Sequence, residues 1–444
     1  MKKINIILVC MIIVASLFLS PCVSADWSMF RSDPARSGVG TYSSTGSSVL
    51  MPTLLWKTNI EWNLTEWDIW PSIGPDLQYK SRSWTEPAVV DNVVYVGVKP
   101  RISWNFKSGL WSIEKIEFYA FNVTDGTEIW NYKDASSKRV TPPAVVNGMV
   151  YFGTEKYTCA LNSSDGSLLW KYPVGPIGTI SSYPAVTNGM VYLGDDELRA
   201  INAINGHSVW NFTNDDGLFL SPAVANGIVY VGSSDGNIYA VDADTGDKIW
   251  DFRAGDFPSP TVANGVVYAM ASSNNIYALD AISGTKIWNN SIQHSWVGPT
   301  GRNFAIGNNI IYSYSADNEL NAFNSIDGTK IWNYAFEKKR VISSAPTVVK
   351  DIVYVNSNYS VYALTAQNGE MLWTYTMNDK VSSPVIVNSV AYVSSGDQFF
   401  AIAVPTPSLQ EPFPTTLVIS SLVILSIIVI GILAYSRSTR GKHR

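Results

Sequence analysis

Tryptophans gather in two long segments that interrupt an otherwise regular sequence, and they are the side chains best suited to binding. These segments, residues 58 to 85 and 98 to 116, are much longer than the matching parts of other repeats in the chain. An indole ring offers a flat apolar platform for a sugar or a protein surface. A third long segment, 289 to 303, adds a histidine and one more tryptophan. The predicted binding surface comprises Trp62, Trp67, Trp70, Trp84, Trp104, Trp111, His294 and Trp296.

The alternative for these segments is a lid, in which the loops pack on one another and bury their own aromatic rings. A binding surface and a lid both predict tryptophans in these segments, so the sequence does not decide between the two interpretations. Alanine at Trp67, Trp70 and Trp104 separates them, because a lid would lose stability while binding stays unchanged.

Acidic residues give weaker candidates for chemistry. Asp242, Asp244 and Asp247 loosely resemble an oxygen-rich metal loop. Their positions recur in a turn of every repeat, which favours turn formation instead. The run Asp195-Asp196-Glu197 is expected to be a solvated loop.

Histidine and cysteine supply no recognisable catalytic or metal site. His207 falls in a repeat turn, and His294 is expected on a surface loop. Cys159 is expected to be a small buried residue. No nucleophile is paired with a base, and no spacing fits zinc, so the prediction is no catalytic residue, no metal and no cofactor.

The elements that must position these side chains come from a repeat. Alanine, five residues, glycine, three residues and tryptophan recur seven times with unchanged spacing, as in Ala240, Gly246 and Trp250. Successive tryptophans are 40, 40, 40, 38, 44 and 41 residues apart. A second pattern, proline eight residues before tyrosine, precedes each copy. Its eighth copy begins at Pro384, and in one copy Phe304 replaces the proline.

Each repeat reads as four short strands, called A to D. Short turns join A to B and C to D, and Asn-Gly pairs in the A–B turns are strong hairpin signals. Four strands at a period near 40 residues indicate a β-propeller. The predicted fold is all-β: an eight-bladed β-propeller of four-stranded antiparallel blades, plus one C-terminal transmembrane helix.

The last repeat predicts how the ring closes. It stops after Phe399 to Val404, without the glycine turn and the tryptophan strand. The missing strand is found at the other end of the chain, at about residues 53–58 around Trp56. This segment is expected to add strand D to the last blade.

The Ala-Gly-Trp pattern resembles the tryptophan-docking repeat of the pyrroloquinoline-quinone-like (PQQ-like) propeller family. The opening Asp26-Trp27-Ser28-Met29-Phe30-Arg31 is also similar to that family, and the likeness covers about residues 26–404. The Gly-His and Trp-Asp signatures of WD40 propellers are absent. The resemblance implies that one tryptophan per blade packs on the adjacent blade. These structural docking residues are Trp56, Trp130, Trp170, Trp210, Trp250, Trp288, Trp332 and Trp373.

The family includes quinoprotein dehydrogenases and the propeller lipoprotein of bacterial outer-membrane assembly. In the dehydrogenases, the resemblance implies, adjacent cysteines form a disulfide beside the quinone, and acidic and amide groups hold calcium. This sequence has no adjacent cysteines, and Cys159 is the one cysteine outside the first 25 residues. The enzymatic reading is therefore the less favoured one.

The two ends predict an exported, membrane-anchored protein. Residues 1–25 read as a signal peptide, although Cys22 leaves a lipoprotein signal as an alternative. Residues 26–404 are the propeller, and 405–416 are a proline-rich spacer. Residues 417–435 carry no charge and are long enough to cross a membrane. The basic tail 436–444 is expected in the cytoplasm, which places the propeller outside.

Charge excludes nucleic acid as a partner. Two lysines lie in the signal and four basic residues in the tail, and neither end holds an acid. Of 31 basic residues, 25 therefore remain in the exported part against 36 acidic ones, a formal charge of −11. Six Asn-x-Ser/Thr sites are possible glycosylation positions.

Together these observations predict a non-catalytic binding or scaffolding propeller at the cell membrane, with an extracellular protein or glycan as ligand. Two alternatives stay open: a quinone-dependent or other oxidoreductase, and a structural component of the cell surface.

Overall fold

The computed structural model describes residues 51–59, 83–99, 102–105, 110–113, 116–134, 136–137, 139–175, 182–214, 217–271, 275–291, 304–315, 319–336 and 345–405. These residues form strands, turns and loops, and they include no helix able to cross a membrane. The predicted signal peptide, the helix at 417–435 and the tail at 436–444 lie outside them, as does the spacer from residue 406 on.

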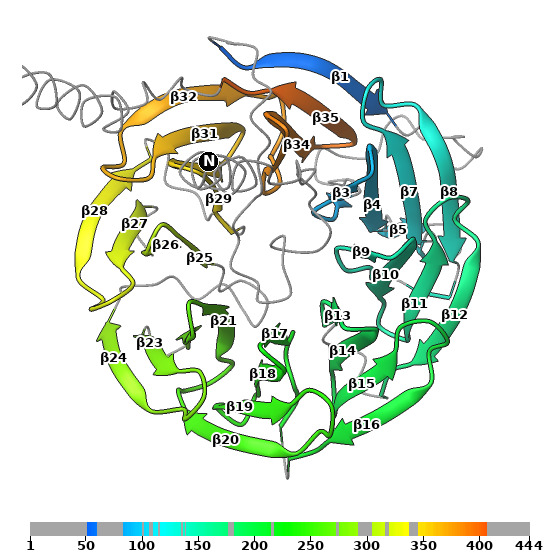
Figure 1. Ribbon diagram of the computed structural model, residues 1–444. Helices are drawn as coiled ribbons and strands as arrows, with labels where there is room; N and C mark the ends of the chain where they lie inside the picture. Colours follow the sequence, from blue (N-terminus) through cyan, green and yellow to red (C-terminus); the bar gives the residue numbers. More distant parts are fainter. Residues whose placement is uncertain are drawn as a thin grey trace, which may run out of the picture. The chain divides into compact units, whose positions relative to one another are not determined.

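The described strands form eight antiparallel blades, which confirms the predicted propeller, and Figure 1 shows them arranged in a ring. In each blade strand A is innermost and strand D lies at the circumference. The strands of blades 1 to 4 follow in the order A to D. Blade 1 has β3 (Ala88–Val90), β4 (Val93–Lys99), β7 (Ile116–Asn122) and β8 (Glu128–Asp134), and blade 2 has β9 (Ala144–Val146), β10 (Met149–Gly153), β11 (Tyr157–Asn162) and β12 (Leu168–Pro173). Blade 3 has β13 (Ala185–Thr187), β14 (Met190–Gly194), β15 (Leu198–Asn202) and β16 (Ser208–Phe212), and blade 4 has β17 (Ala223–Ala225), β18 (Ile228–Gly232), β19 (Asn237–Asp242) and β20 (Lys248–Arg253).

The second half of the ring follows the same plan. Blade 5 has β21 (Ser259–Ala263), β22 (Val266–Met270), β23 (Asn275–Asp280) and β24 (Lys286–Ser291), and blade 6 has β25 (Phe304–Gly307), β26 (Ile310–Tyr314), β27 (Glu319–Asn324) and β28 (Lys330–Ala335). Blade 7 has β29 (Thr347–Val349), β30 (Ile352–Ser357), β31 (Ser360–Thr365) and β32 (Met371–Thr376), and blade 8 has β33 (Val385–Val387), β34 (Val390–Ser395), β35 (Gln398–Ala403) and β1 (Thr53–Asn59). Blade 1 also carries the short strand β2 (Ser83–Trp84), which pairs with β4. The strands β5 (Ile102–Asn105) and β6 (Leu110–Ile113) form a separate hairpin.

Residue type explains the order of strands within a blade. Inner strands such as β18 are β-branched and aromatic and are buried on both faces, as suits strands packed between neighbouring blades. In the outer strand β20, Trp250 is the buried residue, and the others are exposed or half-buried. Asn226 and Gly227 join β17 to β18 with φ of +52° and +75°, the geometry of a tight hairpin turn.

A glycine and a tryptophan meet between neighbouring blades, which places the tryptophans as the family resemblance implied. Gly246 lies in the C–D turn of blade 4 with φ of +80°, and a Cβ there would lie 2.8 Å from Cδ2 of Trp210 in blade 3. A larger residue would therefore push the indole ring away. The same approach joins Gly126 to Trp56, Gly166 to Trp130, Gly206 to Trp170, Gly284 to Trp250, Gly328 to Trp288 and Gly369 to Trp332.

Six of the eight junctions also share one carbonyl oxygen between two donors. Nε1 of Trp250 donates to the Ala281 carbonyl of the next blade at 3.0 Å, and the hydroxyl of Tyr230 donates to the same oxygen at 3.0 Å. Blades 1 to 6 repeat this arrangement. Both lone pairs of a buried carbonyl are thus satisfied, which ties the blades at a fixed point.

Removing one of the two donors tests the value of the shared carbonyl. Burial raises the pKa of Tyr230 to about 12, so the phenol stays protonated and donates at any physiological pH. We expect Tyr230→Phe to lower the free energy of unfolding by about 1 kcal/mol, since one buried hydrogen bond is lost and the tryptophan bond stays. Urea unfolding of both proteins measures this. Equal stability would show that the hydroxyl adds nothing at this junction.

Two docking tryptophans depart from the pattern. Trp288 is half-buried. Trp373 is buried, but its Nε1 has no hydrogen-bond partner. Blade 7 is followed by blade 8, in which strand C ends without a C–D turn, so this junction lacks the glycine found at the others.

The ring closes as the sequence predicted. β1 pairs with β35, and Trp56 lies opposite Ala401 while Lys57 lies opposite Phe400. In Figure 1 the blue β1 runs beside the orange β35. Nε1 of Trp56 donates to the carbonyl of Val123 in blade 1 at 2.6 Å. The start of the propeller thus completes its last blade and contacts its first.

Candidate functional site

The predicted binding residues divide into three groups in the structure. Trp62, Trp67, Trp70, His294 and Trp296 lie outside the described residues. Trp104 and Trp111 belong to the hairpin β5–β6, and Trp84 lies in β2.

Trp84 requires a correction, because it lies in the core and offers no exposed platform. It is 6% exposed. Its ring centroid is 5.4 Å from that of Phe399 in blade 8 and 6.4 Å from that of Phe121 in blade 1. The residue therefore fills the junction of the first and last blades, which differs from the exposed platform and also from the packing of loop on loop expected of a lid.

A regular feature of the repeats reveals this role for Trp84. It stands three residues before the proline of strand A, and three other repeats place Val140, Phe219 and Val381 there. Each of these pairs with strand B of its own blade, and each is buried. An apolar residue at this position is thus a core residue of the ring.

The hairpin β5–β6 is the largest addition to the repeat within the described residues. It occupies the B–C connection of blade 1, where blade 4 has only Ser233 to Gly236. Trp104 and Trp111 are directly opposite each other in its register. The two strands form a sheet of their own, separate from the strands of blade 1.

The B–C connections share one face of the propeller with the D–A connections, which we call the connection face. Antiparallel order places both at the same strand ends. Hydrogen bonds confirm this in blade 3. The amide of Phe219 in a D–A connection donates to the carbonyl of Asp195 in a B–C connection at 2.7 Å. The amide of Gly175 in another D–A connection donates to the Asp195 carboxylate at 3.1 Å.

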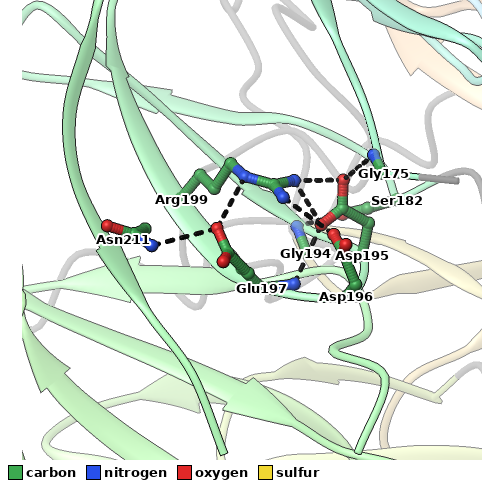
Figure 2. A network of polar contacts seen from close by, with 8 residues as sticks. All are labelled: Gly175, Ser182, Gly194, Asp195, Asp196, Glu197, Arg199 and Asn211. Atoms are coloured by element: carbon green, nitrogen blue, oxygen red, sulfur yellow. Dashed lines mark hydrogen bonds and ion pairs between the residues drawn. The ribbon is translucent and has the colours of Figure 1, made fainter.

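Arg199 organises a polar network on this face (Figure 2). Its guanidinium contacts Asp195, donates from Nη2 to Asp196 at 2.8 Å and donates from Nε to Glu197 at 3.1 Å. Glu197 also accepts a hydrogen bond from Asn211 at 3.0 Å. The Arg199 side chain is 11% exposed. The run Asp195-Asp196-Glu197 is therefore a partly buried ion network, which corrects the expected solvated loop.

The carboxyl groups of this network differ in acidity. Burial, together with the adjacent Asp196, raises the pKa of Asp195 above its ordinary value. Hydrogen bonds from Asp195 and Arg199 lower the pKa of Asp196. One acid is thus pushed toward its neutral form while its neighbour is held ionised. Together with the amides of Gly175 and Phe219, the network links the B–C connection of blade 3 to the two D–A connections beside it.

Blade 4 builds a related network with different partners. Asp235 lies in its B–C connection and accepts hydrogen bonds from the Tyr239 hydroxyl at 2.6 Å and the Asn214 amide at 2.7 Å. Arg253 donates to the Asp235 carbonyl at 2.6 Å. Tyr239 occupies the strand C position that Arg199 holds in blade 3. In both blades, a carboxylate in the B–C connection therefore contacts the side chain at this position of strand C, and this contact orders the connection face.

The other candidates have structural roles. Asp242 accepts hydrogen bonds from the amides of Asp244 and Thr245, and Asp247 accepts one from the Thr245 hydroxyl, as expected for turn formation. Cys159 is buried, and burial raises the pKa of its thiol to about 12. Within the described ranges, no three His, Cys, Asp or Glu side chains are grouped so as to hold a metal ion.

Solved structures similar to this one include BamB and two quinohemoprotein alcohol dehydrogenases. BamB from Moraxella catarrhalis is 17% identical, with a TM-score of 0.56 over 79% of this chain and 97% of that one. The quinohemoprotein alcohol dehydrogenase ADHIIG from Pseudomonas putida HK5 is 15% identical, with a TM-score of 0.65 over 88% and 82%. The quinohemoprotein alcohol dehydrogenase from Comamonas testosteroni is 14% identical, with a TM-score of 0.64 over 86% and 81%. At these identities the likeness shows the fold alone.

Sequence comparison identifies the family. No curated protein sequence matches the chain. The family model described as outer membrane protein assembly factor BamB matches residues 76–180, 114–275 and 272–406. These matches cover most of the chain and contain seven of the eight docking tryptophans. The chain therefore belongs to the PQQ-like β-propeller family.

Proposed function

We propose that this chain is a non-catalytic propeller that is anchored in the cell membrane and binds an extracellular protein or glycan through its connection face. The observation that carries the proposal is the hairpin β5–β6. A repeat that is regular elsewhere gains an additional sheet at one connection, and binding residues typically lie on such connections of a rigid scaffold.

Two polar networks on the connection face, in blades 3 and 4, support this proposal. Arg199 and Asp235 hold the loops of blades 3 and 4 in place with buried hydrogen bonds and ion pairs. Loops ordered in this way lose little conformational entropy when a partner binds. The rigid ring thus supplies a preorganised face, and the hairpin adds a separate two-stranded sheet to it.

Replacing the hairpin tests the proposal. Residues 100–115 are exchanged for Ser-Ser-Asp-Gly, the connection that joins β18 to β19 in blade 4. We expect this variant to melt at the temperature of the parent protein, because the four strands of blade 1 stay intact. We expect it to lose binding to a glycan array and to proteins cross-linked on the surface of the source cells. Retention of every ligand of the parent would contradict the proposal.

A matched control lies on the opposite face, in the C–D turns. Ile204, Ile282 and Ile326 are exposed there at 70–77%. Serine at all three positions removes apolar surface of a comparable kind and leaves the connection face unchanged. The control variant should bind like the parent. Loss of binding in the control alone would move the binding surface to the turn face.

A further inference from the structure

The circumference of the ring carries a regular belt of exposed apolar side chains. The residue before each docking tryptophan points outward from strand D and is between 38% and 51% exposed. The eight members are Leu55, Ile129, Leu169, Val209, Ile249, Ile287, Ile331 and Leu372. Because this residue is aliphatic and exposed in every blade, it does not distinguish one part of the circumference from another as a binding surface.

The residue one position earlier breaks the symmetry. It is lysine in blades 4, 5 and 6, glutamate in blade 1 and serine in blade 3. In blades 2, 7 and 8 it is apolar, so that Leu168-Leu169, Met371-Leu372 and Leu54-Leu55 form exposed apolar pairs, and of these three blades only 7 and 8 are neighbours. We call Met51 and the two pairs of blades 7 and 8 the seam patch.

Charged residues are few on the outer strands of blades 7 and 8, as they are on β12 and β16 in blades 2 and 3. β32 in blade 7 carries no charged residue, and β1 in blade 8 carries only Lys57. Four blades away from β1, the outer strand β20 carries Lys248, Asp251 and Arg253. An apolar edge with one cation, in a chain of negative net charge, is suited to a lipid surface with anionic headgroups.

The chain leaves the propeller beside the seam patch. β35 ends at Ala403, which is paired with Thr53, and Ile402 is paired with Leu54. Only residues 405–416 separate this exit from the uncharged segment 417–435. Twelve residues at no more than about 3.6 Å each span at most about 43 Å, which limits the distance between the ring and any membrane that holds residues 417–435.

We propose that the seam patch rests on the lipid bilayer, so that the ring stands on the edge formed by blades 7 and 8. The inference rests on the proposed membrane anchoring and adds an orientation to it. Burial of these side chains in the headgroup region contributes apolar transfer energy, and Lys57 contributes attraction to anionic lipids. The connection face then stands upright and is accessible from the side.

Depth-dependent fluorescence quenching tests this orientation in the full chain. Cys10→Ser and Cys22→Ser leave the buried Cys159 thiol, which does not compete for labelling because burial raises its pKa. Single cysteines at Leu55 and Leu372 carry the fluorophore. Matched controls are Leu169 in blade 2, which is also part of an apolar pair, and Ile249 in blade 4. The vesicles contain phosphatidylcholine, phosphatidylglycerol and a lipid with a nitroxide headgroup.

We expect nitroxide lipids to quench positions 55 and 372 at least about twofold more than positions 169 and 249. Equal quenching at all four positions would overturn the inference. So would weak quenching at 55 and 372 that rises when the protein is diluted in lipid, since that assigns the patch to a second copy of the chain, which shields it from lipid. Vesicle flotation separates the two proposals: a chain that fails to float refutes the anchoring as well, and a floating chain with uniform quenching refutes only the orientation.

Discussion

Replacing Trp56 with alanine is expected to lower the free energy of unfolding by about 3–5 kcal/mol, the usual cost of removing a large buried aromatic side chain. Trp56 is 8% exposed and belongs to the core shared by blades 1 and 8. Its Nε1 bond to Val123 is lost as well. The substitution therefore weakens the one junction where the ends of the propeller meet. Urea unfolding, followed by tryptophan fluorescence and circular dichroism, measures the effect.

A double-mutant cycle shows whether the loss arises at the glycine contact. A Cβ at Gly126 would lie 2.5 Å from Cε3 of Trp56, and Gly126 has φ of +73°. Gly126→Ala should therefore cost about 1–2 kcal/mol for the backbone and about 1–3 kcal/mol more for the clash. In the Trp56→Ala background the clash cost should vanish, because the indole is gone.

Gly227 supplies the control for the backbone cost. Its φ is +75°, and nothing lies within 4 Å of an added Cβ. Gly227→Ala should cost only the backbone part and should show no coupling to Trp56. Additive effects of Gly126→Ala and Trp56→Ala would mean that the ring does not close through this contact.

The sequence was sufficient to predict the blades and their closure, because these depend on residue types with strict steric demands. Glycine is needed where φ is positive and an indole lies against the backbone, as at Gly246. Such a residue has to recur at a fixed distance from the tryptophan strand. The eighth repeat lacked this strand, and the segment around Trp56 supplied it.

The shared carbonyls could not be predicted in the same way. The acceptor at Ala281 is a backbone oxygen, which every residue possesses. The donors Tyr230 and Trp250 are visible in the repeat, but their common partner depends on how two blades are aligned in space. Side-chain periodicity carries no information on that alignment.

Trp84 and Arg199 show where the prediction of the site failed. The number of tryptophans in a loop does not distinguish a buried ring from an exposed one, and the position of Trp84 relative to Pro87 was the more informative signal. Arg199 stands where Tyr239 stands in the next blade. An arginine at an aromatic position of strand C, next to three acids, indicates an internal ion network.

Replacing Arg199 with methionine is expected to destabilise the protein by about 3–5 kcal/mol at pH 8, because three carboxyl groups lose their cation in a partly buried site. Methionine keeps much of the apolar stem, so the loss reports charge more than packing. Lys248→Met is the control. It breaks the exposed pair with Asp251 and should cost at most about 0.5 kcal/mol.

The defect of Arg199→Met should shrink as the pH falls. In the parent, the pKa of Asp195 is raised, so its ionisation disfavours folding as the pH rises above its unfolded value. The pKa of Asp196 is lowered, so its contribution is present above the unfolded value and is lost as the pH falls through the folded one. These two dependences have opposite signs and therefore oppose each other in the parent.

Without the guanidinium, the pKa values of Asp195 and Asp196 should both rise, since each loses the positive charge that lowers its pKa. Protonation then relieves the repulsion, at about 1.4 kcal/mol for each unit of pKa shift. Urea unfolding at pH 8, 6.5 and 5 should therefore show a narrowing gap between parent and variant. A second substitution, Asp195→Asn, should recover part of the loss at pH 8. A gap that is constant with pH would mean that Arg199 stabilises the connection face by packing instead of charge.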